Sequence, residues 1–216
     1  MELEDYNCSG ITWSIRPETS DKLVIHENFL ADEYRIKGNL KGALSVLDIG
    51  ANIGAFSIAA IRAGAQMVYA YEPEPDNFSL ATIHVERCGL SDKIRLAERA
   101  VWTDYKGVRL NPAQGNTAVE EDGDIEVPSL PLDAILRSHE RIDYLKIDVE
   151  GAEVPMLLAA DSNELAKVEL LGMEFHGQVP EWGDMIRKLS GVFDLEIVGH
   201  AYPHENSGGM IYGRRK

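Results

Sequence analysis

The sequence contains few cysteines and no long apolar segment. Its two cysteines, Cys8 and Cys88, lie far apart in the chain, so they lack the close spacing of a zinc site and are expected to be free thiols in a reducing compartment. No stretch approaches the roughly 18 apolar residues that a membrane-spanning helix needs. The first residues are acidic, so we expect no signal peptide and a cytoplasmic protein.

Basic residues are also scarce. The chain has 21 Lys and Arg against 36 Asp and Glu, a net charge of −15, which disfavours binding to nucleic acid or to an anionic membrane. The hydrophobic fraction of 44% is that of an ordinary globular protein. At 216 residues the chain is long enough to build a core without disulfides. We therefore expect a single domain over residues 1–216, with residues 1–43 as a lead-in.

Beyond residue 43, short apolar runs alternate with helical patterns. The runs predict strands at 44–49, 67–71, 94–98, 143–148, 168–175, 193–198 and 210–212. The helical patterns lie at 55–63, 75–87, 132–136, 153–160 and 181–189. This alternation indicates an α/β three-layer sandwich with a seven-stranded, mostly parallel sheet. The last two strands have no helix between them, so the last strand is expected to run antiparallel.

Two regions depart from this rhythm. Residues 104–128 contain several glycines and prolines and a run of acids, which indicates a hairpin or a flap that closes over substrate. In the lead-in, residues 23–25 resemble a short strand and residues 27–36 a helix.

The segment DIGANIG, residues 48–54, follows a predicted strand and opens a predicted helix. It is neither the dinucleotide G-x-G-x-x-G pattern nor a phosphate loop. Its glycines permit close approach of a ligand, whereas Asp48 would repel a pyrophosphate. Glu72 ends the next strand, about 20 residues after Gly50, where an acid accepts ribose hydroxyls in nucleotide-binding sheets. An adenosine with a charged amino-acid tail, S-adenosylmethionine, fits both acids, although two surface acids at strand ends are the simpler alternative.

The segment DYLKIDVEGAE, residues 143–153, places Lys146 and Asp148 on one face of a buried strand. Burial of charged side chains in a strand costs free energy, so such residues are usually paired or functional. Asp148 falls at the carboxyl end of the strand, where a ligand is expected. Lys146 either orients Asp148 or serves as its structural partner, and Glu153 is most simply an acid in the first turn of a helix.

Four motifs together resemble the FkbM-type methyltransferases over about residues 25 to 176. They are VLDIGANIG at 46–54, YEP at 71–73, AV at 100–101 and KIDVEGAE at 146–153. The resemblance implies a class I, Rossmann-like methyltransferase fold, S-adenosylmethionine as methyl donor and O-methylation of a small molecule or sugar. By position, the cofactor-binding residues would be Tyr34, Asp48, Gly50, Ala51, Asn52, Gly54, Glu72, Pro73, Ala100 and Val101. The glycine loop would hold the methionine tail, Glu72 the ribose, and residues 100–101 the adenine side.

The candidate catalytic residues are Asp148, Lys146 and Glu150. We interpret Asp148 as the base that takes the proton of the acceptor hydroxyl, with Lys146 orienting it. A metal site is the less favoured alternative. Asp148, Glu150, Glu174 and His176 are suitable ligands, but a buried hydrogen bond between Glu174 and His176 would account for that pair equally well.

Three functions remain open from the sequence. A small-molecule O-methyltransferase is the preferred one. An RNA methyltransferase has the same fold, but the charge of −15 counts against it. A non-catalytic S-adenosylmethionine-binding domain is the third. His200 and His204 are most simply part of a surface loop rather than metal ligands.

Overall fold

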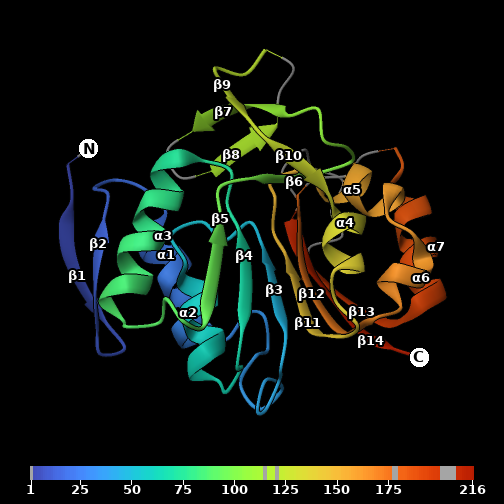
Figure 1. The fold of residues 1–216 in the computed structure, drawn as a ribbon, viewed down its shortest axis with the longest axis horizontal. Helices are drawn as coiled ribbons and strands as arrows, with labels where there is room; N and C mark the ends of the chain where they lie inside the picture. Colours follow the sequence, from blue (N-terminus) through green and yellow to red (C-terminus); the bar gives the residue numbers. More distant parts are fainter. Residues whose placement is uncertain (1, 114–115, 120–121, 177–179, 200–207) are drawn as a thin grey trace.

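Seven strands form the central sheet, as the alternation predicts (Figure 1). The computed structural model describes residues 2–113, 116–119, 122–176, 180–199 and 208–216. Across the sheet the strands are ordered β13 (Phe193–Gly199), β14 (Gly208–Arg215), β12 (Val168–His176), β11 (Ile142–Ile147), β3 (Val46–Ile49), β4 (Val68–Tyr71) and β5 (Ile94–Ala97). β14 is antiparallel to both of its neighbours, and the other pairings are parallel. The expected fold class and the reversed last strand are both confirmed.

Helices cover both faces of the sheet (Figure 1). One layer consists of α1 (Asp21–His26), α2 (Ala55–Arg62) and α3 (Pro75–Arg87). The other consists of α4 (Leu132–Arg137), α5 (Glu153–Ala159), α6 (Ser162–Leu165) and α7 (Trp182–Val192). β3 is buried on both sides, because Val46 packs into the first layer while Leu47 and Ile49 pack into the second. The mostly apolar sequence of β3 reflects this double burial.

The lead-in begins with an antiparallel hairpin that the sequence analysis did not predict, formed by β1 (Glu4–Cys8) and β2 (Ile11–Ile15). The strand expected at residues 23–25 is wrong, because these residues lie within α1. Only one side of this short run is buried: Ile25 is 0% exposed and Leu23 is 57% exposed. A run of three apolar residues does not distinguish a helix from a strand.

The helix expected at residues 27–36 is shorter than predicted. A π-helical turn, η1 (Glu27–Ala31), ends at Asp32, which has a left-handed backbone with φ of 55°. The chain then turns so that Tyr34 and Ile36 are buried in the same apolar cluster as α2. The lead-in therefore contributes to the main core and reaches the sheet.

Residues 104–128 include a small sheet that lies over the carboxyl ends of the parallel strands, at the top of Figure 1. Its strands are β7 (Val108–Ala113), β8 (Asn116–Val119) and β9 (Ile125–Val127), which pair antiparallel in the order β8-β7-β9. Two short parallel strands, β6 (Ala100–Trp102) and β10 (Ser129–Pro131), connect it to the body. We call residues 104–128 the flap.

Two expectations from composition can be compared with the structure. Cys8 and Cys88 are free thiols, as predicted. Among the described helices, none has the length and hydropathy required to cross a bilayer. His200 and His204, expected in a surface loop, lie outside the described residues.

Candidate active site

The turn after β3 places the glycine loop between the ends of two neighbouring strands. The N–H groups of Gly50 and Ala51 both donate to the carbonyl oxygen of Tyr71, at 3.0 Å. Gly50 has φ of +83°, and a Cβ there would lie 1.7 Å from the carbonyl oxygen of Asp148. Only glycine allows this approach. The end of β3 therefore lies directly against the end of β11.

Glu72 follows β4 and receives three hydrogen bonds. The backbone N–H of Asn52 donates to Oε2 at 2.6 Å, while the backbone N–H of Glu74 and the side-chain amide of Asn77 donate to Oε1 at 3.0 and 3.4 Å. The Glu72 side chain is almost fully buried. Burial raises the pKa of Glu72 to about 7, although these hydrogen bonds act in the opposite direction. These hydrogen bonds fix the position of the carboxylate at the cavity wall.

A cavity lies where these elements meet, at the carboxyl ends of β3, β4 and β11 and beneath the flap. The predicted residues Gly50, Asn52, Glu72 and Pro73 line one side of it, and Ala100, Val101, Asp148 and Glu150 line another. In an open α/β sheet this is the position where ligands bind. The cavity thus brings together eight residues that the sequence analysis named, and their roles stay predictions.

Two further residues of the cavity wall lie outside the four sequence motifs. Asn77, in the first turns of α3, lines the cavity and contacts Glu72. Leu110 reaches the cavity from β7, and its side chain is 1% exposed. β7 of the flap thus forms part of the cavity wall. The alternation of Val108 and Leu110 with polar residues was the available signal for an inward-facing flap strand.

Asp48, Ala51 and Gly54 do not line the cavity. Gly54, with φ of +83°, begins α2 at a point where a Cβ would lie 3.3 Å from the Cα of Ala81. Its absent side chain therefore lets α2 pack closely against α3. Asp48 is 0% exposed and lies beneath the glycine loop, where the Ser57 hydroxyl donates to it at 2.6 Å. The structure places Asp48 in a supporting position rather than at the ligand surface.

Lys146 is the ionic partner of two carboxylates. Its Nζ lies 3.3 Å from Asp48 Oδ1 and 3.4 Å from Asp148 Oδ2. The same ammonium donates to the carbonyl oxygen of Gly50 in the glycine loop. Burial lowers the pKa of Lys146, but the two carboxylates outweigh it and raise that pKa above its usual value. Lys146 does not line the cavity, so it acts as a positioning residue that joins β3, β11 and the loop.

Tyr34 reaches the site from the lead-in. Its hydroxyl donates to Asp148 Oδ2 at 3.0 Å and lies 3.5 Å from Glu174 Oε2. Tyr144 in turn donates its hydroxyl to the backbone oxygen of Tyr34. Burial and the charge of Asp148 hold the pKa of Tyr34 well above its usual value, so the hydroxyl remains a donor. Tyr34 is not part of the cavity wall that the predicted cofactor residues form; it orients Asp148 from outside it.

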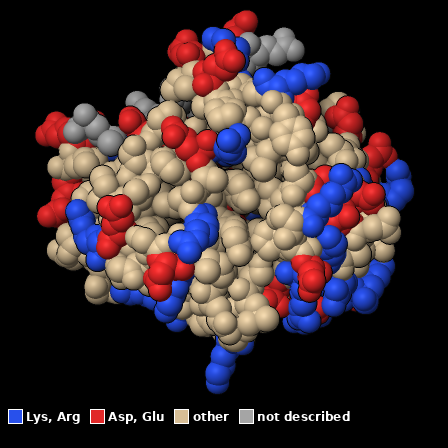
Figure 2. Space-filling model, viewed as in Figure 1, with Lys and Arg blue, Asp and Glu red and all other residues tan. Residues whose placement is uncertain are grey.

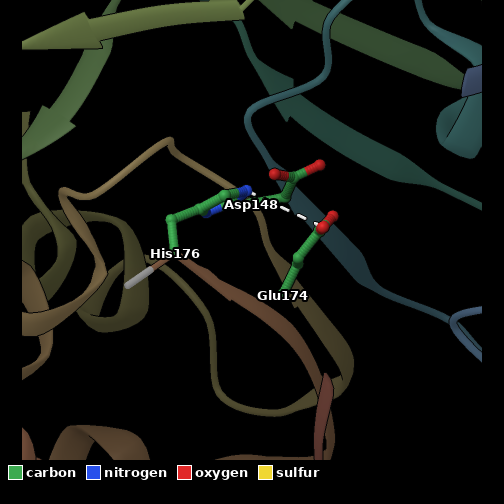
Figure 3. Close-up of side chains that lie close together, drawn as sticks. All are labelled: Asp148, Glu174 and His176. Atoms are coloured by element: carbon green, nitrogen blue, oxygen red, sulfur yellow. Dashed lines mark ion pairs between the residues drawn. The ribbon is translucent and has the colours of Figure 1, made fainter. Parts of the chain in front are cut away.

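A histidine lies beside Asp148 at the end of the adjacent strand. β11 and β12 pair in parallel with Ile147 opposite Met173, so Asp148 and Glu174 leave the sheet next to each other, with His176 following (Figure 3). One ligand atom from each of Asp148, Glu174 and His176 lies within 4.8 Å of the others. The sequence analysis named these three residues, together with Glu150, as the less favoured metal site.

His176 makes its hydrogen bond to Glu153 rather than to Glu174. His176 Nδ1 lies 2.8 Å from Glu153 Oε1, and the Glu153 side chain is 2% exposed. The opposite ring nitrogen, Nε2, faces Glu150 Oε2 at 3.4 Å and Glu174 Oε1 at 3.7 Å. Glu153 does occupy the first turn of α5, as expected, but it also fixes the imidazole.

Negative charge dominates this end of the site. Burial, followed by the charge of Asp148, raises the pKa of Glu174 to about 8. Burial lowers the pKa of His176, but Glu153 and the neighbouring carboxylates outweigh it and raise that pKa to about 9. Glu27, from the lead-in, has its pKa raised to about 7 by burial and by the charges of Glu33 and Asp148. The arrangement therefore favours a positively charged group.

Comparison with known proteins identifies the family. Residues 48–196 match the family model of the methyltransferase FkbM domain. The chain belongs to the FkbM methyltransferase family. This is the family that the four sequence motifs predict.

The individual proteins that the chain resembles are distant in sequence. The chain is 28% identical to methyltransferase sdnD of Sordaria araneosa, over 63% of this chain and 68% of that protein. It is 30% identical to the AMB antimetabolite synthetase AmbE of Pseudomonas aeruginosa over 66% of this chain. The matched region spans only 9% of the length of AmbE. Among solved structures, methyltransferase FkbM from Methylobacillus flagellatus shares the fold, with a TM-score of 0.57 at 17% identity, over 80% of this chain and 44% of that one.

Proposed function

We propose that this methyltransferase uses S-adenosylmethionine as the donor and methylates a hydroxyl oxygen of a small molecule. The observation that carries the proposal is the charge of the cavity wall. It contains the carboxylates Glu72, Asp148 and Glu150, and none of the described residues that line it is Lys or Arg. A nucleotide phosphate is disfavoured there. A phosphate-free adenosine that bears a sulfonium fits.

The shape of the wall supports an adenosine. Glu72 offers carboxylate oxygens at the position where nucleotide-binding sheets accept ribose hydroxyls. Ala100, Val101 and Leu110 supply an apolar surface suited to a base. TYW2 from P. horikoshii, which shares the fold with a TM-score of 0.54 at 13% identity, over 98% of this chain and 70% of that one, was determined in complex with MeSAdo.

The chemistry is a displacement at carbon. S-adenosylmethionine supplies a methyl group on a sulfonium that leaves as a neutral thioether. An oxygen lone pair of the acceptor forms the new C–O bond as the C–S bond breaks, and the hydroxyl proton passes to Asp148. Tyr34 and Lys146 hold the Asp148 carboxylate in place. The flap excludes water, and alignment of the reacting atoms supplies much of the acceleration.

A small acceptor is favoured over RNA. The net charge of −15 repels a phosphate backbone. Figure 2 shows that Lys and Arg side chains on the face in view are interspersed with Asp and Glu rather than gathered into one patch. The carboxylates around Asp148 add to this repulsion at the site itself. An RNA substrate would predict binding that weakens steeply with added salt.

Calorimetric titration with S-adenosylhomocysteine tests the donor. We expect micromolar binding to the wild type and a loss of at least about tenfold in Glu72→Gln, because the amide replaces a carboxylate acceptor by a weaker one. Glu86→Gln is the matched control, since Glu86 is an exposed residue of α3. Absence of binding to folded wild-type protein would refute S-adenosylmethionine as the donor.

A further inference from the structure

We propose that Asp148, Glu174 and His176 bind one divalent cation, and that this cation holds an oxygen of the methyl acceptor. The second part of this inference rests on the proposed function. It reverses the preference drawn from the sequence, in which a Glu174–His176 hydrogen bond made a metal unnecessary. His176 instead makes that bond to Glu153.

The three side chains have the spacing of a ligand set. They leave the carboxyl ends of β11 and β12, and their ligand atoms lie within 4.8 Å of one another (Figure 3). Two ligands on opposite sides of a cation at about 2.1 Å are about 4.2 Å apart. Small side-chain rotations are therefore enough to bring these atoms to bonding distance, and the paired strands hold their backbones in place.

The orientation of His176 is a second observation in favour of a cation. Glu153 is 2% exposed and accepts from Nδ1 at 2.8 Å. The opposite ring nitrogen, Nε2, then faces Glu174 and Glu150, which are both acceptors. Without a metal, a proton on Nε2 occupies the space between these groups, and a bound cation would replace that proton. A carboxylate that holds the far nitrogen of a histidine is the arrangement found behind metal-ligating histidines.

The balance of charge around the cluster also favours a bound cation. Glu27 and Glu33 act on Glu174 in addition to the ligand carboxylates. In the described part of the chain, the positive groups that act on this cluster are His176 and Lys146. Lys146 is shared with Asp48 and with the glycine loop. One divalent cation would offset most of the remaining negative charge.

The ligand set also indicates which cation is suitable. Two carboxylates and one imidazole suit Mn²⁺ or Mg²⁺, which prefer oxygen-rich octahedral sites. Three positions would remain for water or acceptor oxygens. Asp148 belongs both to this cluster and to the cavity wall, so an acceptor oxygen on the cation would lie next to the donor. An acceptor with a second oxygen beside its hydroxyl would occupy two of these positions.

Such a cation would assist the reaction as a Lewis acid. It lowers the pKa of the bound hydroxyl and stabilises the charge that develops on oxygen. The hydroxyl proton still passes to Asp148, and the carboxylate oxygen that does not bind the cation accepts it. The substrate class is therefore an alcohol or phenol with a neighbouring oxygen, rather than an isolated hydroxyl.

Mn²⁺ titration followed by electron paramagnetic resonance tests the site without any acceptor, because the signal of free Mn²⁺ is lost on binding. We expect one Mn²⁺ per wild-type chain after removal of metals with a chelator. Glu174→Gln and His176→Ala should each weaken binding by more than about tenfold. Glu140→Gln, which changes an exposed acid elsewhere, should leave it unchanged.

S-adenosylhomocysteine binding to the same variants separates the two proposals. Retained binding in Glu174→Gln and His176→Ala shows that they are folded and that the donor site is intact. Wild-type protein that binds S-adenosylhomocysteine but not Mn²⁺ would overturn the cation and leave the carboxylates for an acceptor ammonium group. Mn²⁺ binding that both variants retain would also overturn it. Mn²⁺ binding without S-adenosylhomocysteine binding would support the cation and refute the proposed donor.

Discussion

Tyr34 donates its hydroxyl to Asp148 Oδ2 over 3.0 Å, although 114 positions separate the two residues in the chain. The bond connects the lead-in to the end of β11. It restricts the Asp148 carboxylate together with Lys146, which approaches the same oxygen at 3.4 Å. The lead-in therefore contributes to the proposed site as well as to the core.

Tyr34→Phe tests this role. Loss of a hydrogen bond to a charged group costs about 1.5–3 kcal/mol, so we expect kcat to fall by roughly tenfold or more. The KM for the donor should change little, because Tyr34 does not line the cavity. Steady-state kinetics measures both. Tyr105→Phe, at a side chain that is 70% exposed, is the control. An unchanged kcat in Tyr34→Phe would contradict a positioning role.

Lys146→Met should destabilise the fold. Asp48 is 0% exposed, and removal of one partner of a buried ion pair costs about 3–5 kcal/mol. Denaturant unfolding measures the loss. The double variant Lys146→Met/Asp48→Asn should recover part of it, since the fully buried Asp48 charge is then removed together with its partner. Lys22→Met removes an exposed pair with Glu4 and should cost at most about 1 kcal/mol. Equal losses in the two single variants would contradict this account.

The sequence predicted the wall of the cavity better than the groups behind it. Residues such as Gly50 and Glu72 end parallel strands, and such ends converge whatever the details of packing. The seven-stranded, mostly parallel sheet followed from the alternation of strands and helices, and the reversed β14 followed from the missing helix before it. Those features depend on local periodicity, which a single sequence contains.

Groups that depend on distant packing could not be predicted. Asp48 and Asp148 both end buried strands, yet only Asp148 lines the cavity, because Lys146 and Ser57 enclose the other carboxylate. Tyr34 contacts Asp148 only because the lead-in packs on α2. The partner of His176 is likewise set by the position of α5 relative to β12, and no pattern in the sequence fixes that.

Gly50→Ala should destabilise the fold by more than the strain of a left-handed backbone alone, because it also creates a steric clash. Its φ of +83° is unfavourable for alanine, and its Cβ would lie 1.7 Å from the Asp148 backbone. Gly89→Ala shares the left-handed strain, with φ of +66°, but its Cβ would meet nothing within 4 Å. We expect the free energy of unfolding to fall by about 1 kcal/mol in Gly89→Ala and by at least about 3 kcal/mol in Gly50→Ala. Thermal unfolding measures both losses. Equal losses would mean that the β3 loop tolerates displacement from β11.

The pKa of Glu72, raised to about 7 by burial, makes donor binding dependent on pH. Ribose hydroxyls donate to the carboxylate, so S-adenosylhomocysteine should bind the ionised form, and its affinity should fall by about tenfold for each pH unit below 7. Stability of the unliganded protein should change in the opposite sense. The folded state holds a proton that the unfolded state loses near pH 4.5, so the Glu72 contribution to stability declines as pH rises toward 7.

Calorimetry from about one pH unit below 7 to about one above it measures the dependence of affinity on Glu72. Glu72→Gln cannot ionise, so its affinity should stay close to that of the protonated wild type and lose this pH dependence. Glu86→Gln, on the exposed face of α3, should follow the wild-type curve. If the wild-type affinity were constant across this range, the ribose contact could not involve the Glu72 carboxylate. If Glu72→Gln kept the wild-type slope, another group would have to be the one that titrates.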